Sequence, residues 1–186
     1  MLDSIGMEDR MVRPVRRIVT ANDEHGLSQV LIDAMATNIQ GALTELWHTD
    51  SMPASNAGTR DNAAGWSGLE PPRGGALFRF FEVAPEAVEE ALPPADRERL
   101  WAERFAAIKA VHCRPDTRRH PAMHKTSTTD YIILLAGRIT LVLDRGEVDL
   151  QPFDVVVQRG SNHAWVNRGG ENALLMAVLV DAGIGG

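Results

Sequence analysis

The sequence contains very little cysteine, and its 186 residues include one, Cys113. A single cysteine excludes an intramolecular disulfide framework and every zinc module built on several cysteines. No hydrophobic run approaches the roughly 20 residues of a membrane-spanning helix, and the first residues lack the apolar middle of a secretory signal. Positive charge is also scarce, because 19 Lys and Arg stand against 25 Asp and Glu. This balance argues against a nucleic-acid-binding stripe or a polybasic membrane patch. We therefore expect a soluble, cytoplasmic protein that binds neither nucleic acid nor membranes.

The residues that are present favour one globular domain over residues 1–186. Hydrophobic residues make up 44% of the chain and charged residues 24%, which is ordinary for a soluble domain. A chain of this length buries about 70% of the surface that it exposes when unfolded, so it has enough material for a core. The 16 glycines and 10 prolines punctuate residues 53–75 and the chain after residue 137. This pattern predicts a β-rich fold with one helical interruption.

Short apolar segments between turn residues predict ten strands. In the links between them, Asp144, Arg145 and Gly146 resemble a hairpin turn in which Gly146 supplies a positive φ. Short strands separated by such short turns predict a β-sandwich or a β-barrel. The predicted strands are 15–20, 28–32, 42–49, 76–83, 130–136, 138–143, 147–151, 154–158, 163–167 and 173–181.

Two segments interrupt the strands. Residues 95–111 carry one apolar stripe of an amphipathic helix, which we expect to pack on the outside of a sheet. The stripe consists of Leu100, Trp101, Phe105, Ile108 and Val111. Residues 51–75 are rich in proline and glycine and form a loop of unusual length, which is typical of a mobile lid or of a disordered insertion.

The chain around the predicted strand 130–136 resembles the first sequence motif of the cupin superfamily. That motif has two histidines one residue apart, an acidic residue and then a glycine. His124, Thr126, Asp130 and Gly137 occupy these positions. Thr126 replaces the second histidine, and Asp130 replaces the usual glutamate.

The second cupin motif is matched by residues 158–167. Gly160, His163 and Asn167 fit the glycine, histidine and asparagine of that motif, and Gln158 stands where the family has proline. The segments LWHTDSMPA, LEPPRGGALFR and the two motifs together are similar to a group of single-domain bacterial and fungal cupins of poorly defined activity.

This resemblance implies an all-β fold, namely a cupin-type double-stranded β-helix (jelly-roll barrel) with one helical insertion. The core motifs then occupy residues 120–181 and the helical insertion residues 84–113. Residues 1–83 form an amino-terminal arm and the early barrel strands, with the loop 51–75 among them. Such barrels commonly pair through edge strands, so we expect a homodimer and consider residues 1–20 a source of one such strand.

In the family's barrel the two motifs face each other, so His124, Asp130 and His163 are predicted metal ligands. Two imidazoles and a carboxylate are typical of non-haem iron, and Zn²⁺, Mn²⁺ or Ni²⁺ accept them as well. Because aspartate is shorter than glutamate, Asp130 either reaches the metal or bonds to a ligated water or a histidine. Thr126 and Asp130 are predicted catalytic residues together with His48, which supplies a proton or a hydrogen bond.

Five further residues are predicted to bind substrate. Trp165 follows His163 by two residues and therefore shares its face of the strand. Aromatic residues on other strands are candidates for an apolar wall, and each also suits ordinary core packing. The set is Trp47, Phe80, His120, Tyr131 and Trp165; alternation places Tyr131 on the face opposite Asp130, and His120 is predicted at the pocket mouth.

Two functions from different classes agree with these residues. The first is a metal-dependent enzyme with dioxygenase, isomerase or dehydratase chemistry on a small oxygen-bearing substrate. The second is a metal-free domain that binds or senses a small molecule, in which the helix 95–111 and the loop 51–75 serve dimerisation and gating. Cys113 has no activating neighbour in this interpretation, and any metal is held by histidine and oxygen ligands.

Overall fold

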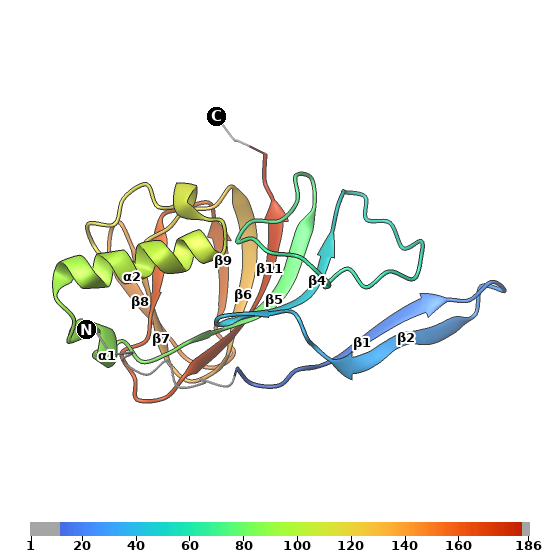
Figure 1. Ribbon diagram of the computed structural model, residues 1–186, viewed down its shortest axis with the longest axis horizontal. Coiled ribbons are helices and arrows are strands. Elements are labelled where there is room, and N and C mark those ends of the chain that lie inside the picture. Colours follow the sequence, from blue (N-terminus) through green and yellow to red (C-terminus); the bar gives the residue numbers. More distant parts are fainter. Residues whose placement is uncertain (1–11, 184–186) are drawn as a thin grey trace, which may run out of the picture.

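The computed structural model describes residues 12–183, which form two antiparallel β-sheets around one hydrophobic core and a separate hairpin (Figure 1). The larger sheet has the order β3 (Ile39–Gln40), β4 (Leu43–Thr49), β5 (Ala76–Val83), β11 (Ala173–Asp181), β6 (Thr128–Ala136) and β9 (Val155–Arg159). The smaller sheet has the order β10 (His163–Val166), β7 (Ile139–Leu143) and β8 (Glu147–Leu150). The hairpin pairs β1 (Arg16–Asn22) with β2 (Ser28–Met35).

The predicted fold class is confirmed, because the core lies between the two sheets as in a double-stranded β-helix. Leu77, Leu134 and Leu175 of the larger sheet pack with Leu141 and Trp165 of the smaller one. All ten predicted strands are present, and the short β3 is an addition. Among the described residues, no helix is long and apolar enough to cross a membrane.

The first two strands form an arm and not a part of the barrel wall. In Figure 1 the β1–β2 hairpin projects from the barrel. Arg17 connects the hairpin to the barrel, because its guanidinium donates to the Asp61 carboxylate at 2.6 Å and to the Leu46 carbonyl at 3.0 Å. Of residues 1–20, the first 11 lie outside the described part of the chain, and residues 16–20 already pair with β2. The expected homodimer therefore remains a prediction.

The helical insertion contains α1 (Ala87–Glu90), α2 (Pro94–Ala107) and a 3₁₀ turn, η1 (Val111–Cys113). The predicted helix 95–111 was too long at its carboxyl end. Lys109 has a φ of 56°, Ala110 N–H donates to the Phe105 carbonyl, and Lys109 N–H donates to the Ala106 carbonyl. These bonds are a Schellman motif, which usually has glycine in the left-handed position. Because lysine and not glycine occupies this position, the sequence did not indicate that the helix ends here.

Helix α2 covers the outer face of the smaller sheet. Trp101 packs against the buried Val142, Ala164 and Val166, and Phe105 is buried with Cys113 in a neighbouring cluster. This agrees with the expected packing of the helix on the outside of a sheet. Val111, assigned to the same apolar stripe, is instead 63% exposed, because the helix ends before it.

The loop 51–75 has two unlike halves. Residues 51–60 are exposed, as expected of a lid. Residues 61–70 are not free, since Trp66 packs against the core and its carbonyl accepts from the Asn38 side chain at 3.0 Å. Arg79 donates to the Gly68 carbonyl at 2.8 Å, and Leu69 N–H donates to the Ile108 carbonyl at 3.0 Å. A fully mobile or disordered loop is therefore wrong for this half, which closes one side of the barrel.

Candidate functional site

The two motif histidines lie side by side. His124 and His163 exchange both backbone hydrogen bonds, at 2.8 and 2.9 Å, so that the segment before β6 is bridged to the start of β10. Their imidazole ring centroids are 4.2 Å apart. The resemblance predicted this convergence, and the structure brings the two side chains together.

Hydrogen bonding selects one tautomer for both imidazoles. His124 Nδ1 lies 3.0 Å from the carbonyl of Ala122, and His163 Nδ1 lies 2.9 Å from that of Ser161. A carbonyl only accepts, so each Nδ1 carries the proton and each neutral ring keeps a lone pair on Nε2. No hydrogen bond among the described residues uses either Nε2. Burial lowers the pKa of His163 to about 3 and also lowers that of His124, which favours the neutral rings.

Asp130 and Thr126 lie nearby on one face of the chain. Thr126, Thr128 and Asp130 are all buried at alternate positions, and the two threonine hydroxyls are 2.7 Å apart. Burial raises the pKa of Asp130 to about 6, and its Oδ1 has no hydrogen-bond partner. His124, Asp130 and His163 do not form a group whose ligand atoms all lie within 4.8 Å of one another. The two imidazoles suit a divalent metal, and the role of Asp130 as a third ligand stays a prediction.

Gly160 and Asn167 of the second motif explain how the backbone brings β9 and β10 to the histidines. Gly160 has a φ of 55°, and a Cβ there would lie 3.2 Å from the Thr126 carbonyl, so glycine lets β9 turn towards the histidines. Asn167 is 1% exposed, and its amide donates to the carbonyls of Val83 and Glu171 at 2.7 Å. The asparagine therefore joins β5 to the turn after β10 and is a structural residue.

Sequence reasoning missed a charged pair inside the barrel. Glu45 on β4 and Arg79 on β5 are each 2% exposed, and Arg79 Nη2 lies 3.0 Å from Glu45 Oε1. Burial raises the pKa of Glu45 and of Asp130, and the Arg79 guanidinium opposes both rises. Nε and Nη1 of Arg79 have no partner among the described groups. The signal was the alternation of Leu77, Arg79 and Phe81, which places an arginine between core residues.

Two more of the predicted residues lie towards the barrel interior. Trp165 is 8% exposed, belongs to the core, and packs edge-on to His163 with ring centroids 5.7 Å apart. His48 is 4% exposed, stacks near Trp66 at 5.0 Å, and its Nε2 lies 3.1 Å from Asp50. In register it is opposite Leu77, on the inward face of β5. Both positions agree with the expected side of the sheet.

Three predicted substrate-binding residues lie on the outer face of the larger sheet. Trp47 pairs with Phe78, which is 38% exposed and contacts Phe80 edge-on at 6.2 Å. Tyr131 is 50% exposed on the same outer face. Strand alternation separates these side chains from the interior, so Trp47, Phe80 and Tyr131 do not line the space beside the histidines. Trp47 faces outward because β4 contains a bulge between Glu45 and Trp47, and Phe80 faces outward because it alternates with the inward Arg79 on β5.

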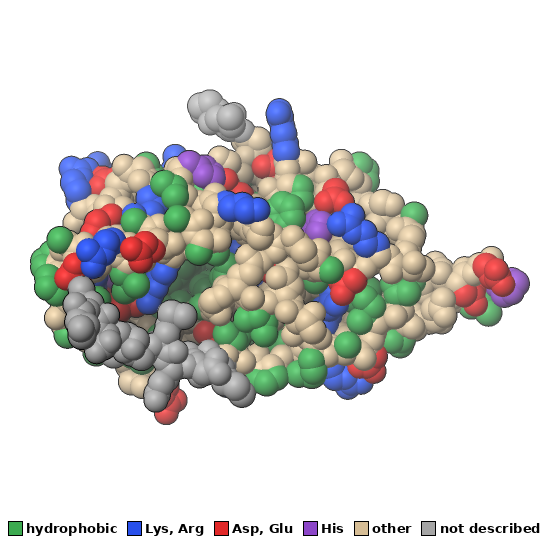
Figure 2. Space-filling model, viewed as in Figure 1, with side chains coloured by type: hydrophobic (Ala, Val, Ile, Leu, Met, Phe, Trp, Pro, Cys, Tyr) green, Lys and Arg blue, Asp and Glu red, His purple; other side chains and the backbone are tan. Residues whose placement is uncertain are grey.

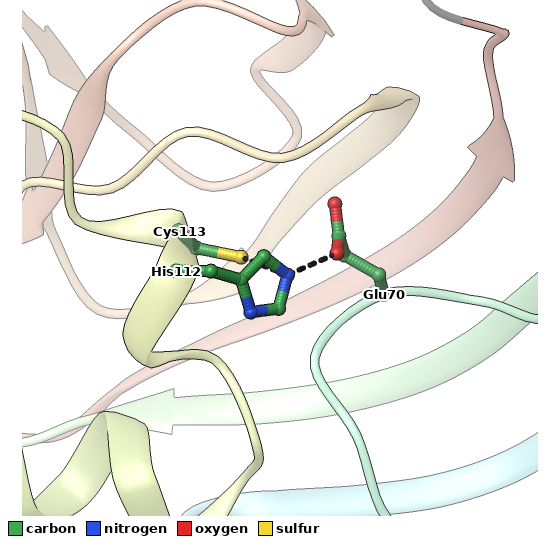
Figure 3. Close-up of side chains that lie close together, drawn as sticks. All are labelled: Glu70, His112 and Cys113. Carbon is green, nitrogen blue, oxygen red and sulfur yellow. Dashed lines mark hydrogen bonds and ion pairs between the residues drawn. The ribbon is translucent and has the colours of Figure 1, made fainter.

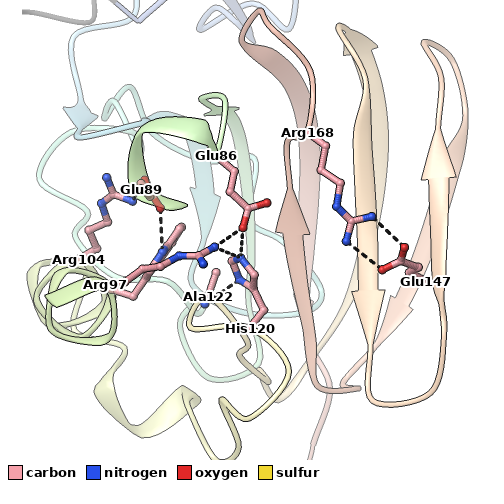
Figure 4. A network of polar contacts seen from close by, with 9 residues as sticks. Glu86, Glu89, Arg97, Arg104, His120, Ala122, Glu147 and Arg168 are labelled. Carbon is pink, nitrogen blue, oxygen red and sulfur yellow. Dashed lines mark hydrogen bonds and ion pairs between the residues drawn. The ribbon is translucent and has the colours of Figure 1, made fainter. Parts of the chain in front are cut away.

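His120 belongs to a polar network between α1, α2 and the loop before β6 (Figure 4). Its Nδ1 accepts from the backbone N–H of Ala122 at 3.0 Å, so Nε2 donates to Glu86, 2.9 Å away. Arg97 bonds to the same carboxylate, and the Trp101 ring packs edge-on to His120. Both ring nitrogens of His120 therefore form hydrogen bonds within the protein. His120 lies in this structural network and not at the expected pocket mouth.

A second group of ligand-type side chains lies at the surface beside the barrel. Glu70, His112 and Cys113 have ligand atoms that are all within 4.8 Å of one another (Figure 3). His112 Nε2 lies 2.8 Å from Glu70 Oε2 and 3.5 Å from Cys113 Sγ. Burial and the Glu70 carboxylate raise the pKa of Cys113 to about 12. The thiol is therefore buried and not activated, as the sequence indicated, although the ring of the adjacent His112 lies close to it.

Two surface clefts lie away from the motif histidines. One, of about 540 Å³, is lined by Asp116, Arg118, Arg119, Asp144 and Arg145. These side chains carry both charges and include neither motif histidine. Figure 2 shows acidic and basic side chains interspersed on the face that is drawn, and a hollow with hydrophobic side chains below α2. The candidate functional site is therefore assigned to the two motif histidines and not to a surface cleft.

Comparison with known proteins finds relatives among curated proteins. The chain is 55% identical over 170 residues to phomopsin biosynthesis cluster protein D of Diaporthe leptostromiformis, covering 90% of this chain and 78% of that protein. It is 41% identical over 63 residues to a cupin-domain-containing oxidoreductase of Neurospora crassa, covering 32% of each chain. No protein-family model matches the chain.

Solved structures with a similar fold include a cupin 2 conserved barrel domain protein from Salinispora arenicola. The TM-score is 0.35 and the identity 20%, covering 63% of this chain and 70% of that one. A cupin family protein with a double-stranded β-helix fold from Methanocaldococcus jannaschii gives a TM-score of 0.36 and 11% identity, covering 57% and 70%.

The fold and the paired histidines define a small jelly-roll protein with one inward-facing imidazole pair. The chain belongs to the cupin superfamily. Its relatives include proteins named for fungal biosynthesis clusters and cupin-domain oxidoreductases.

Proposed function

We propose that the protein is a metal-dependent cupin oxidoreductase that acts on a small oxygen-bearing molecule. The observation that carries the proposal is the imidazole pair, in which His124 and His163 each donate Nδ1–H to a carbonyl and keep Nε2 unprotonated. This arrangement, with the second ring nitrogen held by a backbone carbonyl, is typical of metal-ligating histidines. The names of the cupin-domain oxidoreductases among the relatives support the reaction class.

In this proposal His124 and His163 hold the metal, and Asp130 acts beside them as a third ligand or as the partner of a ligated water. A divalent metal at such a site supplies Lewis acidity or, for iron, redox chemistry. Iron, zinc, manganese and nickel all accept the donor set. The side chains of this chain then decide which molecule enters and how its protons move.

The interior polar residues are proposed to bind the polar part of the substrate. Arg79 keeps two unpartnered nitrogens for an oxygen acceptor. Asp130, whose pKa burial raises to about 6, holds or releases a proton near neutral pH. Thr126 donates or accepts through its hydroxyl, and Trp165 forms an apolar wall that excludes water. His48 is proposed as a second proton donor from β4.

A second candidate function rests on the incomplete ligand set. Thr126 replaces one histidine of the motif, and among the described residues no third ligand lies within 4.8 Å of both imidazole donors. A metal-free barrel that binds or senses a small molecule agrees with this observation. The polar interior would then recognise the ligand by hydrogen bonds alone.

Metal uptake under anaerobic conditions distinguishes the two functions. The protein is stripped with chelator, reconstituted with Fe²⁺ and assayed for bound metal and for changes in metal-centred spectra. We expect about one equivalent in the wild type at this site, with a large loss in His124→Ala and His163→Ala. His25→Ala is the matched control, since this histidine is exposed on the hairpin. Iron content that is unchanged in both site variants would favour the metal-free function.

The homodimer also remains part of the proposal. The outer face of the larger sheet exposes Tyr131 on β6, Val155 and Val157 on the adjacent β9, and Phe78 on β5 beyond β11. Exposed apolar side chains on neighbouring strands are typical of interaction surfaces. Light scattering coupled to gel filtration tests the oligomeric state, and Val157→Glu is expected to shift a dimer towards the monomer. A monomeric wild type would overturn this part.

A further inference from the structure

We propose that Glu70, His112 and Cys113 form a second metal site, which binds a thiophilic divalent cation such as Zn²⁺ at the outer side of the barrel. The three residues offer one oxygen, one nitrogen and one sulfur donor (Figure 3). Zinc is bound by these three donor types, whereas magnesium and calcium take oxygen ligands. The site uses none of the residues of the imidazole pair.

The donor spacing suits a tetrahedral ion. With Zn–S near 2.3 Å and Zn–N near 2.0 Å, tetrahedral angles separate the two donors by about 3.5 Å. His112 Nε2 and Cys113 Sγ are 3.5 Å apart. Glu70 Oε2 and His112 Nε2 are 2.8 Å apart, which is shorter than the roughly 3.3 Å of a tetrahedral pair. A small rotation of the Glu70 side chain opens that separation.

The backbone around the site holds the ligands in place. Glu70 Oε1 accepts from Ser127 N–H at 2.8 Å, which leaves Oε2 for the ion. Cys113 N–H donates to the Ala110 carbonyl at 3.0 Å, and the Cys113 carbonyl accepts from Lys125 N–H at 2.7 Å. Hydrogen bonds that orient ligands from behind are a regular feature of metal sites. The Glu70 carboxylate and the backbone of Cys113 are therefore held in place beside the His112 ring.

Access and charge also suit a cation. The Cys113 thiol is buried against Phe105 and Ala110, while the side chain of His112 is 67% exposed. An ion reaches the donors from the histidine side, and its fourth position faces solvent, where a water completes the coordination. On binding, Sγ releases its proton to solvent and the imidazole stays neutral with its proton on Nδ1, so that a thiolate and a carboxylate neutralise the double positive charge.

The position of the site gives it a structural role. Glu70 comes from the fixed half of the loop 51–75, and Cys113 from the turn after α2; both bond to the segment 125–127. That segment follows His124 and leads into β6, so a bound ion joins the loop, the helical insertion and the start of β6. Zinc is therefore expected to raise thermal stability, whatever the reaction in the barrel.

Cobalt substitution tests the site directly. Co²⁺ added to metal-free protein gives a sulfur-to-cobalt charge-transfer band only when a thiolate is a ligand, and Cys113 is the one cysteine of the chain. We expect the band in the wild type and in His163→Ala, and its loss in Cys113→Ser. His112→Gln, at an exposed position that leaves the core intact, is expected to weaken Zn²⁺ binding at least ten-fold, and Glu70→Gln is expected to weaken it as well.

The controls separate this site from the imidazole pair and from misfolding. Near-ultraviolet circular dichroism checks that each variant is folded, and His25→Ala is expected to bind Co²⁺ as the wild type does. A wild type without the charge-transfer band would overturn the proposal. So would a His112→Gln variant that is folded and keeps wild-type Zn²⁺ affinity. Neither result bears on iron uptake by His124 and His163.

Discussion

Loss of the Arg79 guanidinium is expected to destabilise the barrel strongly. Arg79 and Glu45 are each 2% exposed and lie 3.0 Å apart. Removing one partner of a buried ion pair costs about 3–5 kcal/mol, because the other charge is left uncompensated. Each kcal/mol lowers the Tm of a chain of this size by about 2–4 °C, so Arg79→Met is expected to melt about 6–20 °C below the wild type.

A double variant shows whether the pairing is responsible. Arg79→Met with Glu45→Leu removes both charges and fills the space with apolar side chains, so we expect most of the lost stability to return. Thermal and urea unfolding are followed by circular dichroism at pH 7 in chelator. At pH 4 the penalty of the single variant is expected to shrink, because burial raises the pKa of Glu45 and the carboxyl takes up a proton.

The outcome that refutes this reasoning is equally specific. If Arg79→Met loses less than about 1 kcal/mol, the pair behaves like a solvent-exposed one. If the double variant is no more stable than the single variant, the lost stability came from the hydrogen bond to the Gly68 carbonyl or from packing, and not from an uncompensated Glu45.

Three further variants probe single groups. Burial raises the pKa of Asp130 from 3.8 to about 6, so the folded state keeps a proton that the unfolded chain loses, and stability falls as the pH rises through this range. Asp130→Asn in metal-free protein should therefore be more stable than the wild type above pH 6, by up to about 3 kcal/mol. Tm profiles against pH that run parallel for the two proteins would contradict this. Burial lowers the pKa of His163 from 6.5 to about 3, so its contribution to the free energy of unfolding is present above pH 6.5 and lost towards pH 3. His163→Asn should therefore flatten the dependence of Tm on pH between pH 6.5 and pH 3. An unchanged slope in this variant would contradict the lowered pKa of His163. Asn167→Ala removes the three hydrogen bonds that this buried side chain makes to the backbone of Val83, Gly169 and Glu171, and at about 1 kcal/mol each it should cost on the order of 3 kcal/mol in urea unfolding. A loss within about 0.5 kcal/mol would make the residue dispensable.

The strands were predictable because their signal is local. Apolar runs between turn residues located all ten predicted strands, and Gly146 has the positive φ of 83° that the turn at residues 144–146 required. The helix end was not predictable in the same way. Lys109 occupies a backbone position that glycine usually marks, so the stop depends on the two bonds of the Schellman motif and on packing against the barrel.

The imidazole pair was implied by the resemblance to the cupin motifs, and the structure brings the two side chains together. Strand alternation also placed Thr126 and Asp130 on one buried face and turned Tyr131 away from it. The face of Trp47 was not predictable in this way, because a bulge in β4 sets it and is not visible in a single strand. The outward face of Phe80 follows from the same alternation that places Leu77 and Arg79 inside.

The sequence by itself determined the strand segments, the tight turns and the alternation of buried positions, because each depends on residues close together in the chain. Only the tertiary structure decided which distant groups meet. Glu45 meets Arg79 across the β4–β5 register, and Glu70 reaches Cys113 because the loop between β4 and β5 is pinned along the barrel. Such contacts depend on strand register and on the path of a long loop, and these are set by the packing of the whole core.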